Sequence, residues 1–256
     1  MKPGLVSITF RSLSVESIIE LMCKAGSVGI EWGGDIHVPH GNIALAKRVG
    51  EKTRAAGLEV AAYGSYYRVG ESEAAGLPFT QVLATAKALG APLIRVWAGN
   101  KGAQLSNEND RAKVVIDSKR IASLAAREEI EIAYEYHINT LTDSDQSTRQ
   151  LLKEVGNIST LWQPTCHYST EECLKSIEGI RANLKNIHVY HWVAGQRKAL
   201  SEGRARWELF LNRLSVQNEE RYALIEFVQN NCPENFIRDT NTLKGWIQRA
   251  EDAYVS

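Results

Sequence analysis

The sequence has few cysteines, and their arrangement does not indicate a disulfide framework or a zinc finger. Cys23, Cys166, Cys173 and Cys232 are scattered over 256 residues, and no two of them form a Cys-x-x-Cys pair. The nearest two are seven residues apart, a spacing with no common redox or zinc-binding role. We therefore interpret all four as reduced thiols of the core or of a site wall.

Long apolar runs and an excess of one charge are also missing. No window approaches the roughly 18 to 20 continuous apolar residues that a membrane-spanning helix needs, and Met1 to Arg11 lacks the blocks of a signal peptide. We therefore expect a cytoplasmic protein with no membrane partner. Thirty basic residues balance thirty acidic ones, so no general field attracts a polyanion, and a nucleic-acid partner is disfavoured.

What the sequence does contain is a glycine at regular intervals, directly after an amphipathic stretch. Ala25-Gly26, Ala56-Gly57 and Leu89-Gly90 each end an amphipathic stretch, at intervals of 31 and 33 residues, and an apolar β-rich run follows each one. Glycine directly after a helix is the usual left-handed cap. A repeat of this length is a strand plus a helix, and 256 residues accommodate eight of them.

Continuing the pattern along the chain predicts eight strands and eight helices. The predicted strands are Leu5 to Phe10, Val28 to Trp32, Leu58 to Tyr63, Pro92 to Trp97, Ile130 to Tyr136, Ser159 to Gln163, Asn186 to Tyr190 and Tyr222 to Phe227. The predicted helices are Val15 to Lys24, Ile43 to Ala56, Phe79 to Leu89, Asp110 to Arg127, Asp145 to Val155, Thr170 to Asn183, Arg206 to Leu214 and Leu243 to Tyr254.

Strict alternation of this kind predicts an α/β fold, a (β/α)8 TIM barrel that forms a single domain over residues 1–256. A doubly wound open sheet is the rival fold. It usually carries a glycine-rich phosphate loop after an early strand, and neither GxGxxG nor GxxxxGK[ST] occurs here. The long loops after strands, Arg68 to Pro78, Asn100 to Asn109 and Trp192 to Arg204, are expected to build the active site.

Histidines and tryptophans gather at the predicted strand ends. All six histidines lie in or just after a strand: His37, His40, His137, His167, His188 and His191. Four of six tryptophans share this placement: Trp32, Trp97, Trp162 and Trp192. Imidazoles and aromatic walls at one mouth predict a small-molecule pocket, although such tryptophans can also simply close a barrel.

Two acidic residues lie inside otherwise apolar strands. Glu135 and Glu226 must each be compensated by a cation or a metal, because a buried unpaired carboxylate costs several kcal/mol. With His188 and Gln163 in the same layer, they offer a ligand set that suits one divalent ion, Mn²⁺, Mg²⁺, Co²⁺ or Zn²⁺. The alternative is a structural salt bridge, with Arg95 or Arg11 as the partner.

Four segments carry a resemblance to a known family: Gly4 to Arg11, Gly29 to His37, Tyr134 to His137 and Ile187 to His191. The chain resembles, over essentially its whole length, the xylose-isomerase-like superfamily of sugar isomerases and epimerases, which also holds family 2 apurinic endonucleases. The resemblance implies that Glu135, Gln163, His188 and Glu226 hold one divalent metal. Two positions depart from the family: Gln163 replaces an aspartate, and the histidine expected three residues later falls on Cys166, next to His167.

The resemblance implies a metal-dependent isomerase or epimerase of a sugar or sugar phosphate. Glu135 and Glu226 would be the catalytic pair, transferring a proton through a metal-bound cis-enediolate. The alternatives are an apurinic-endonuclease-like enzyme, and a sugar-binding barrel or lyase with an altered metal site. A homodimer is possible. The expected substrate contacts are Glu31, Trp32, His37, His40, Tyr66, Arg95, Trp97, His137, Trp162, His167, His191, Trp192 and Arg197.

Overall fold

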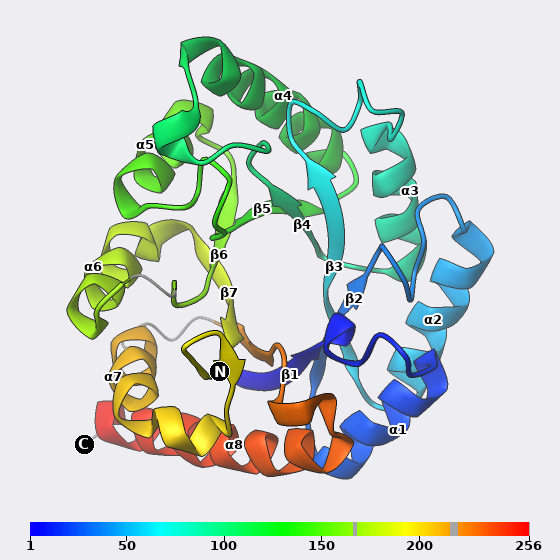
Figure 1. Cartoon of the computed structure of the whole chain (residues 1–256). Coiled ribbons are helices and arrows are strands. Elements are labelled where there is room, and N and C mark those ends of the chain that lie inside the picture. The colour runs from blue at the N-terminus through cyan, green and yellow to red at the C-terminus, as the bar shows by residue number, and fades with distance from the viewer. Residues whose placement is uncertain (166–167, 216–219, 256) are drawn as a thin grey trace.

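The described residues fold into a closed barrel of eight parallel strands surrounded by eight α-helices (Figure 1). The computed structural model describes residues 1–165, 168–215 and 220–255. Around the barrel the strands follow the order β1-β10-β7-β6-β5-β4-β3-β2, and β1 pairs in parallel with both β2 and β10, which closes the ring. The predicted (β/α)8 barrel is confirmed.

The bounds of the elements agree with the repeat in the sequence. The barrel strands are β1 Lys2–Val6, β2 Gly29–Gly33, β3 Glu59–Arg68, β4 Leu93–Trp97, β5 Glu131–Glu135, β6 Ser159–Trp162, β7 Leu184–Val189 and β10 Tyr222–Ile225. The helices are α1 Val15–Ala25, α2 Ile43–Ala55, α3 Phe79–Leu89, α4 Glu108–Ala126, α5 Asp145–Val155, α6 Thr170–Ile180, α7 Arg204–Ser215 and α8 Pro233–Val255. After β7, the short strands β8 Trp192–Val193 and β9 Gln196–Arg197 form an antiparallel hairpin.

Local sequence signals set the helix ends. Gly26 and Gly90 cap α1 and α3 in the left-handed conformation, with φ of 62° and 75°, where a residue without Cβ carries no steric cost. At the start of α6, Ser169 and Glu172 form a capping box in which each side chain accepts the other's backbone N–H. These caps fix where each helix begins and ends, and therefore where the loops at the barrel mouth start.

The first predicted strand, Leu5 to Phe10, is wrong beyond Val6. The chain leaves the barrel after Val6 and makes a 3-10 turn over Ser7–Phe10. Side-chain hydroxyls make this turn favourable: Ser7 Oγ accepts the N–H of Gly33 at 2.9 Å, and Thr9 Oγ1 accepts the N–H of Phe227 at 3.0 Å. Of the apolar run from Leu5 to Phe10, only Leu5 and Val6 therefore belong to a strand.

Two other observed boundaries differ from the predicted ones by five residues or more. Strand β3 runs on to Arg68, and α8 begins at Pro233, ten residues before its predicted start at Leu243. Proline is favoured at the first position of a helix because its φ is already helical and its missing N–H needs no partner there. Of the cysteines, Cys173 is buried but Cys23 is exposed on α1, so the interpretation as a core or site-wall thiol fails for Cys23.

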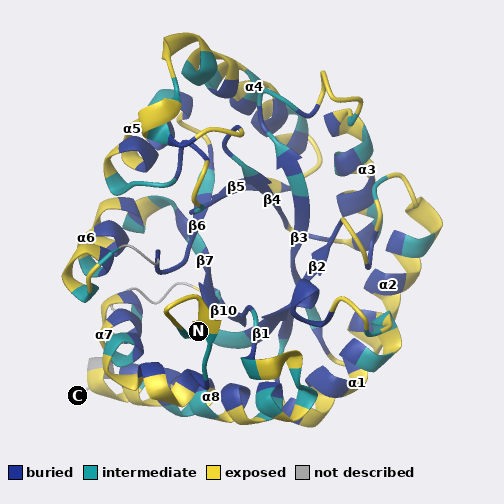
Figure 2. Cartoon of the chain, in the orientation of Figure 1, coloured by how far each residue is buried: buried dark blue, intermediate teal, exposed yellow. Residues whose placement is uncertain are grey.

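Burial follows the layers of the barrel (Figure 2). The strands are buried on both faces, whereas each helix is buried toward the strands and exposed on its outer side. Inside the barrel, small apolar side chains such as Ala62, Leu93, Ala133 and Leu161 form a floor. In the described part of the chain, no helix combines the length and the apolar character needed to cross a bilayer.

Candidate metal centre and substrate pocket

Strand alternation places a polar layer inside the barrel, one step above the apolar floor. Successive residues of a strand point to opposite faces, so Leu93 in the floor puts Arg95 in the layer above it, and Ala133 does the same for Glu135. Glu31, Gln163, His188 and Glu226 enter the same layer from β2 and from the ends of β6, β7 and β10. All six side chains are buried.

Three of these side chains could hold a metal ion together. Ligand atoms of Glu135, His188 and Glu226 all lie within 4.8 Å of one another. The Nδ1 atom of His188 is 3.4 Å from Glu226 Oε2 and 3.8 Å from Glu135 Oε1, and it has no hydrogen-bond partner among the described residues. A buried nitrogen that faces two carboxylates without a hydrogen bond is the arrangement that a cation would complete.

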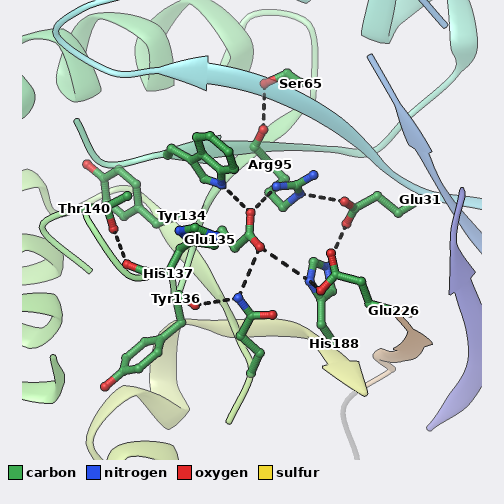
Figure 3. A network of polar contacts seen from close by, with 12 residues as sticks. Glu31, Ser65, Arg95, Tyr134, Glu135, Tyr136, His137, Thr140, His188 and Glu226 are labelled. Atoms are coloured by element: carbon green, nitrogen blue, oxygen red, sulfur yellow. Dashed lines mark hydrogen bonds and ion pairs between the residues drawn. The ribbon is translucent and has the colours of Figure 1, made fainter. Parts of the chain in front are cut away.

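The opposite side of the His188 ring is held in place. Its Nε2 lies 3.2 Å from Glu31 Oε2, as Figure 3 shows. A carboxylate on the second nitrogen is the usual support of a metal-binding histidine, because it fixes the tautomer and the ring orientation. Burial would lower the pKa of His188, but Glu31 and Glu226 outweigh it and raise this pKa to about 10.

Arg95 neutralises part of the negative charge. Its Nε donates to Glu31 Oε1 at 2.6 Å and its Nη1 donates to Glu135 Oε2 (Figure 3). Burial opposes ionisation of Glu31, but Arg95 and His188 overcome it and lower the pKa of this carboxyl to about 2. The pKa of Glu135 is lowered too, again against burial and chiefly by Arg95.

Charge balance bears on the two alternatives left open by the sequence, a metal ion and a structural salt bridge. Three carboxylates, Glu31, Glu135 and Glu226, share the layer with a single guanidinium. The arginine leaves an excess of two negative charges when His188 is neutral, and of one when His188 is protonated, the form that its raised pKa favours. The salt bridge to Arg95 therefore exists, but it does not saturate the cluster. A divalent cation beside His188 would bring the buried charge to zero.

Gln163 contacts the cluster through its amide. Its Nε2 donates to Glu135 Oε1 at 3.2 Å and to the carbonyl of Tyr136 at 2.9 Å. In this orientation the nitrogen, not the oxygen, faces Glu135, and oxygen ligation would require a half-turn of the amide. The role of Gln163 as a metal ligand stays a prediction.

A cavity of about 380 Å³ lies above the cluster, within the usual volume range of small-molecule sites. Eight residues predicted as ligands or substrate contacts line it: Tyr66, Arg95, Trp97, Glu135, His137, Gln163, Trp192 and Glu226. Trp97 donates from Nε1 to Glu135 Oε2 at 2.5 Å and stacks on His137, with ring centroids 4.9 Å apart. The cavity thus has an aromatic wall directly beside the carboxylates.

Two predicted wall residues lie on the wrong side of the sheet. Trp32 is fully buried and donates from Nε1 to Thr53 of α2, and Trp162 packs against Trp207 and Phe210 of α7. The reason is alternation: in β2, Glu31 points inward, so its neighbour Trp32 must point outward to the helices. These tryptophans belong to the core between the barrel and its helices, and the prediction that they contact substrate is corrected.

Other predicted contacts also lie outside the main cavity. His37 contacts Ser7 Oγ at 3.0 Å, His40 contacts the Tyr63 hydroxyl at 2.8 Å, and Glu31 lies beneath the cavity. Arg197 stacks on the cavity residue Phe227, 4.3 Å from the ring centroid, and lines a separate pocket beside Gln229 and Asn231. His191 lines a smaller neighbouring pocket. His167 lies outside the described residues.

The described histidines therefore do not form one group, as a site with several clustered zinc ions would need. Within the described residues only His188 joins the carboxylates, while His137 lies in the cavity wall and His37 and His40 lie near β2. The sequence rule was correct that they follow strand ends. The strand-end rule did not show where in the following loop, or on which face of a strand, each histidine lies.

Several cavity residues were not predicted to line the site. Ile8, Arg11, Tyr136, Ile138, Pro164, Thr165, Tyr190 and Phe227 also line the wall. Four of them, Arg11, Ile138, Pro164 and Thr165, follow a predicted strand within two residues, and Tyr136, Tyr190 and Phe227 are the last residues of predicted strands. This position was a signal that could have found them. Phe227 has a positive φ of 61° and Tyr66 one of 55°, and such strain in bulky residues concentrates at functional sites.

The protein is a TIM barrel, a closed barrel of parallel strands. A buried group of two carboxylates and a histidine lies at the carboxyl end of its strands, under a cavity. The chain belongs to the xylose isomerase-like TIM barrel family, whose model matches residues 19–244. No curated protein matches the sequence.

Solved structures show the same fold at low identity. The probable 3-DHS dehydratase AsbF of Bacillus anthracis is 22% identical, with 95% of this chain and 99% of that chain covered and a TM-score of 0.81. The D-psicose 3-epimerase of Clostridium cellulolyticum H10 is 15% identical, with coverage of 100% and 97% and a TM-score of 0.69. The IOLI protein, solved with a bound zinc atom, is 14% identical, with 99% of both chains covered and a TM-score of 0.70.

Proposed function

We propose that this protein is a metal-dependent isomerase or epimerase of a sugar or sugar phosphate. The observation that carries the proposal is the convergence of Glu135, His188 and Glu226, whose ligand atoms lie within 4.8 Å of one another beneath a cavity with aromatic walls. The similar fold of an epimerase and of a zinc-binding protein supports it.

The residues present fit a divalent ion. Two carboxylates and the unpartnered Nδ1 of His188 form a mixed oxygen–nitrogen set, which suits Mn²⁺, Co²⁺, Zn²⁺ or Mg²⁺. The high pKa of His188 means that an ion would displace a proton from the ring. When bound, the ion would polarise a substrate carbonyl and acidify the neighbouring C–H.

The two glutamates are held differently, and this difference suggests their roles. Glu135 receives hydrogen bonds from Arg95, Trp97 and Gln163. The carboxylate of Glu226 has one ion-pair partner among the described residues, the Nδ1 atom of His188 at 3.4 Å. A general base needs a free lone pair facing the substrate. We therefore assign proton removal to Glu226, which then carries the proton and returns it to the substrate. Glu135, whose oxygens accept from three donors and whose pKa is lowered, would hold the ion.

The cavity wall would orient the substrate chain. Trp97, His137 and Tyr66 form a continuous aromatic surface: Trp97 stacks on His137, and Tyr66 meets Trp97 edge to face at 5.2 Å. Aromatic rings suit the apolar face of a sugar, and they exclude water from the carboxylates below.

The proposal is tested by proton exchange. The protein is incubated in deuterated water with Mn²⁺, Co²⁺ or Mg²⁺ and a panel of free and phosphorylated ketoses and aldoses, and NMR follows deuterium incorporation next to the carbonyl. We expect exchange that EDTA abolishes. Glu226→Gln should slow it about a hundredfold or more. The control Glu220→Gln removes an exposed carboxylate close to β10 and should leave exchange unchanged.

The outcome also separates isomerisation from elimination. The fold similarity to a dehydratase makes loss of a β-hydroxyl after proton removal a second candidate. A product one water lighter than the substrate would favour that candidate. Metal binding with no exchange on any member of the panel would contradict both.

A further inference from the structure

A side pocket opens from the substrate cavity. It has a volume of about 160 Å³ and is lined by Pro164, Thr165, Tyr190, His191, Trp192, Ala194, Gly195, Arg206, Trp207 and Phe210. Four of these residues, Pro164, Thr165, Tyr190 and Trp192, also line the substrate cavity, so the two spaces adjoin. Because its volume is below that of typical ligand sites, the side pocket has room for one group of a substrate.

The side pocket is lined by hydrogen-bond donors without acceptors. The Thr165 hydroxyl, the Trp192 Nε1 and the Arg206 Nε are all buried, and none has a partner within the described residues. Thr165 is only 8% exposed. Leaving a buried donor unsatisfied costs about 1–3 kcal/mol, so three of them around one small space indicate that a ligand supplies the acceptors.

The charge of the side pocket points to an anion. Arg206 has no carboxylate within ion-pair distance in the part of the chain that the structure describes. Its Nη2 donates to the carbonyl of Tyr168 at 3.2 Å and lies 3.6 Å from Cys173 Sγ. These contacts fix the guanidinium without neutralising it, and the Nε–H remains available. A guanidinium, a hydroxyl and an indole N–H are together donors for several oxygen atoms of one group.

We propose that the side pocket binds an oxyanion, a carboxylate or a phosphoryl group, at the end of the substrate remote from Glu135, His188 and Glu226. This assignment of an anionic substrate rests on the proposed function, whereas oxyanion binding by Arg206 and Thr165 does not. Glu135 and Glu226 line the substrate cavity, and the side pocket adjoins that cavity. One molecule would therefore reach both places and be oriented by its two ends.

The first test is binding of simple oxyanions with EDTA present, which removes any contribution of a metal. Inorganic phosphate and acetate are titrated at constant ionic strength against sodium chloride, with tryptophan fluorescence as the signal, because Trp192 and Trp207 line the side pocket. We expect saturable binding of at least one oxyanion and no saturation by chloride. Preference for phosphate would identify a phosphoryl group, and preference for acetate a carboxylate.

Variants distinguish the site from general attraction. Arg206→Met should weaken binding about tenfold or more, because a charge-assisted hydrogen bond is lost. Thr165→Val should weaken it without lowering stability, because the hydroxyl has no partner in the protein. Arg204→Met is the matched control: it removes the same charge from the same helix, but Arg204 is 64% exposed and pairs with Glu208, so binding should be unchanged.

The outcomes separate this inference from the proposed function. Equal binding by wild-type protein and by folded Arg206→Met and Thr165→Val variants, or no saturable binding of either oxyanion, would overturn the inference. Oxyanion binding should survive Glu226→Gln. If Arg206-dependent binding is found but no sugar exchanges deuterium, only the proposed function fails. If sugars exchange but Arg206→Met lowers kcat/KM equally for neutral and acidic substrates, the inference fails alone.

Discussion

At the scale of single residues, the charge of one arginine organises the centre of the barrel. Arg95 donates to Glu31 through Nε and to Glu135 through Nη1, and both carboxylates are buried. The sequence predicted Arg95 as a pocket wall or, alternatively, as a salt-bridge partner of a buried glutamate. In the structure Arg95 pairs with two buried glutamates and also lines the cavity, because its guanidinium lies in the polar layer directly beneath that cavity.

This arrangement makes Arg95 critical for stability. Arg95→Met would leave two buried carboxylates without their cation, and we expect a loss of about 3–5 kcal/mol in the free energy of unfolding. Urea denaturation of the metal-free protein measures it. Arg11→Met is the control, since its pair with Asp35 is largely exposed and should contribute about 1 kcal/mol or less. Similar losses for the two variants would contradict the account.

At the scale of elements, alternation along the strands decides which residues reach the site. The sequence placed Trp32 and Trp162 at the mouth because they lie near strand ends, and both instead pack toward helices. The same rule applied strictly from Glu31 and from Gln163 would have turned both tryptophans outward. What the sequence could not show was the turn after Val6, because hydroxyl contacts to distant strands stabilise it.

Helix packing gives a second test at this scale, using two glycines within helices. Propensity alone predicts that Gly→Ala stabilises a helix by about 1 kcal/mol. At Gly50 in α2, however, a Cβ would lie 2.0 Å from the carbonyl oxygen of Leu89, so the helices must separate. At Gly245 in α8 the nearest atom is Arg249 Nη1, at 3.5 Å.

We therefore expect opposite signs for the same substitution. Gly50→Ala should destabilise the protein by about 1–3 kcal/mol, since overpacking forces backbone shifts, and Gly245→Ala should stabilise it by up to about 1 kcal/mol. Urea unfolding of both variants measures the difference. Stabilisation by Gly50→Ala would show that α2 and α3 do not approach as closely as described.

At the scale of the whole molecule, the candidate metal-binding group of Glu135, His188 and Glu226 joins parts of the chain that are far apart in sequence. Glu135 ends β5, His188 lies in β7 and Glu226 follows β10. An ion held by all three would bind only the closed barrel. Ligand binding to the folded state alone stabilises it by about 2.7 kcal/mol when the ligand is at a hundredfold its Kd.

Metal addition should therefore raise the melting temperature of the entire barrel. We expect Mn²⁺ or Co²⁺ to raise the Tm by several degrees, measured by calorimetry before and after EDTA treatment. Glu226→Gln should remove most of the shift while leaving the metal-free Tm nearly unchanged. A shift of equal size in that variant would mean that the ion binds elsewhere.

The sequence by itself determined the architecture and the chemical inventory. Apolar runs separated by glycine-capped amphipathic helices specify alternating strands and helices, since these signals act within a few residues. The same local logic singled out Glu135, Glu226 and His188, because charged groups in apolar strands require compensation.

Only the tertiary structure decided which of these side chains contact one another. That Glu31 supports His188, that Arg95 joins two carboxylates, and that Arg206 faces an adjoining space all depend on side chains from strands and helices distant in sequence. Closure of β1 against β10 sets the register that brings them to one layer. Contacts of this range are fixed by packing around the ring, and no short window of sequence contains them.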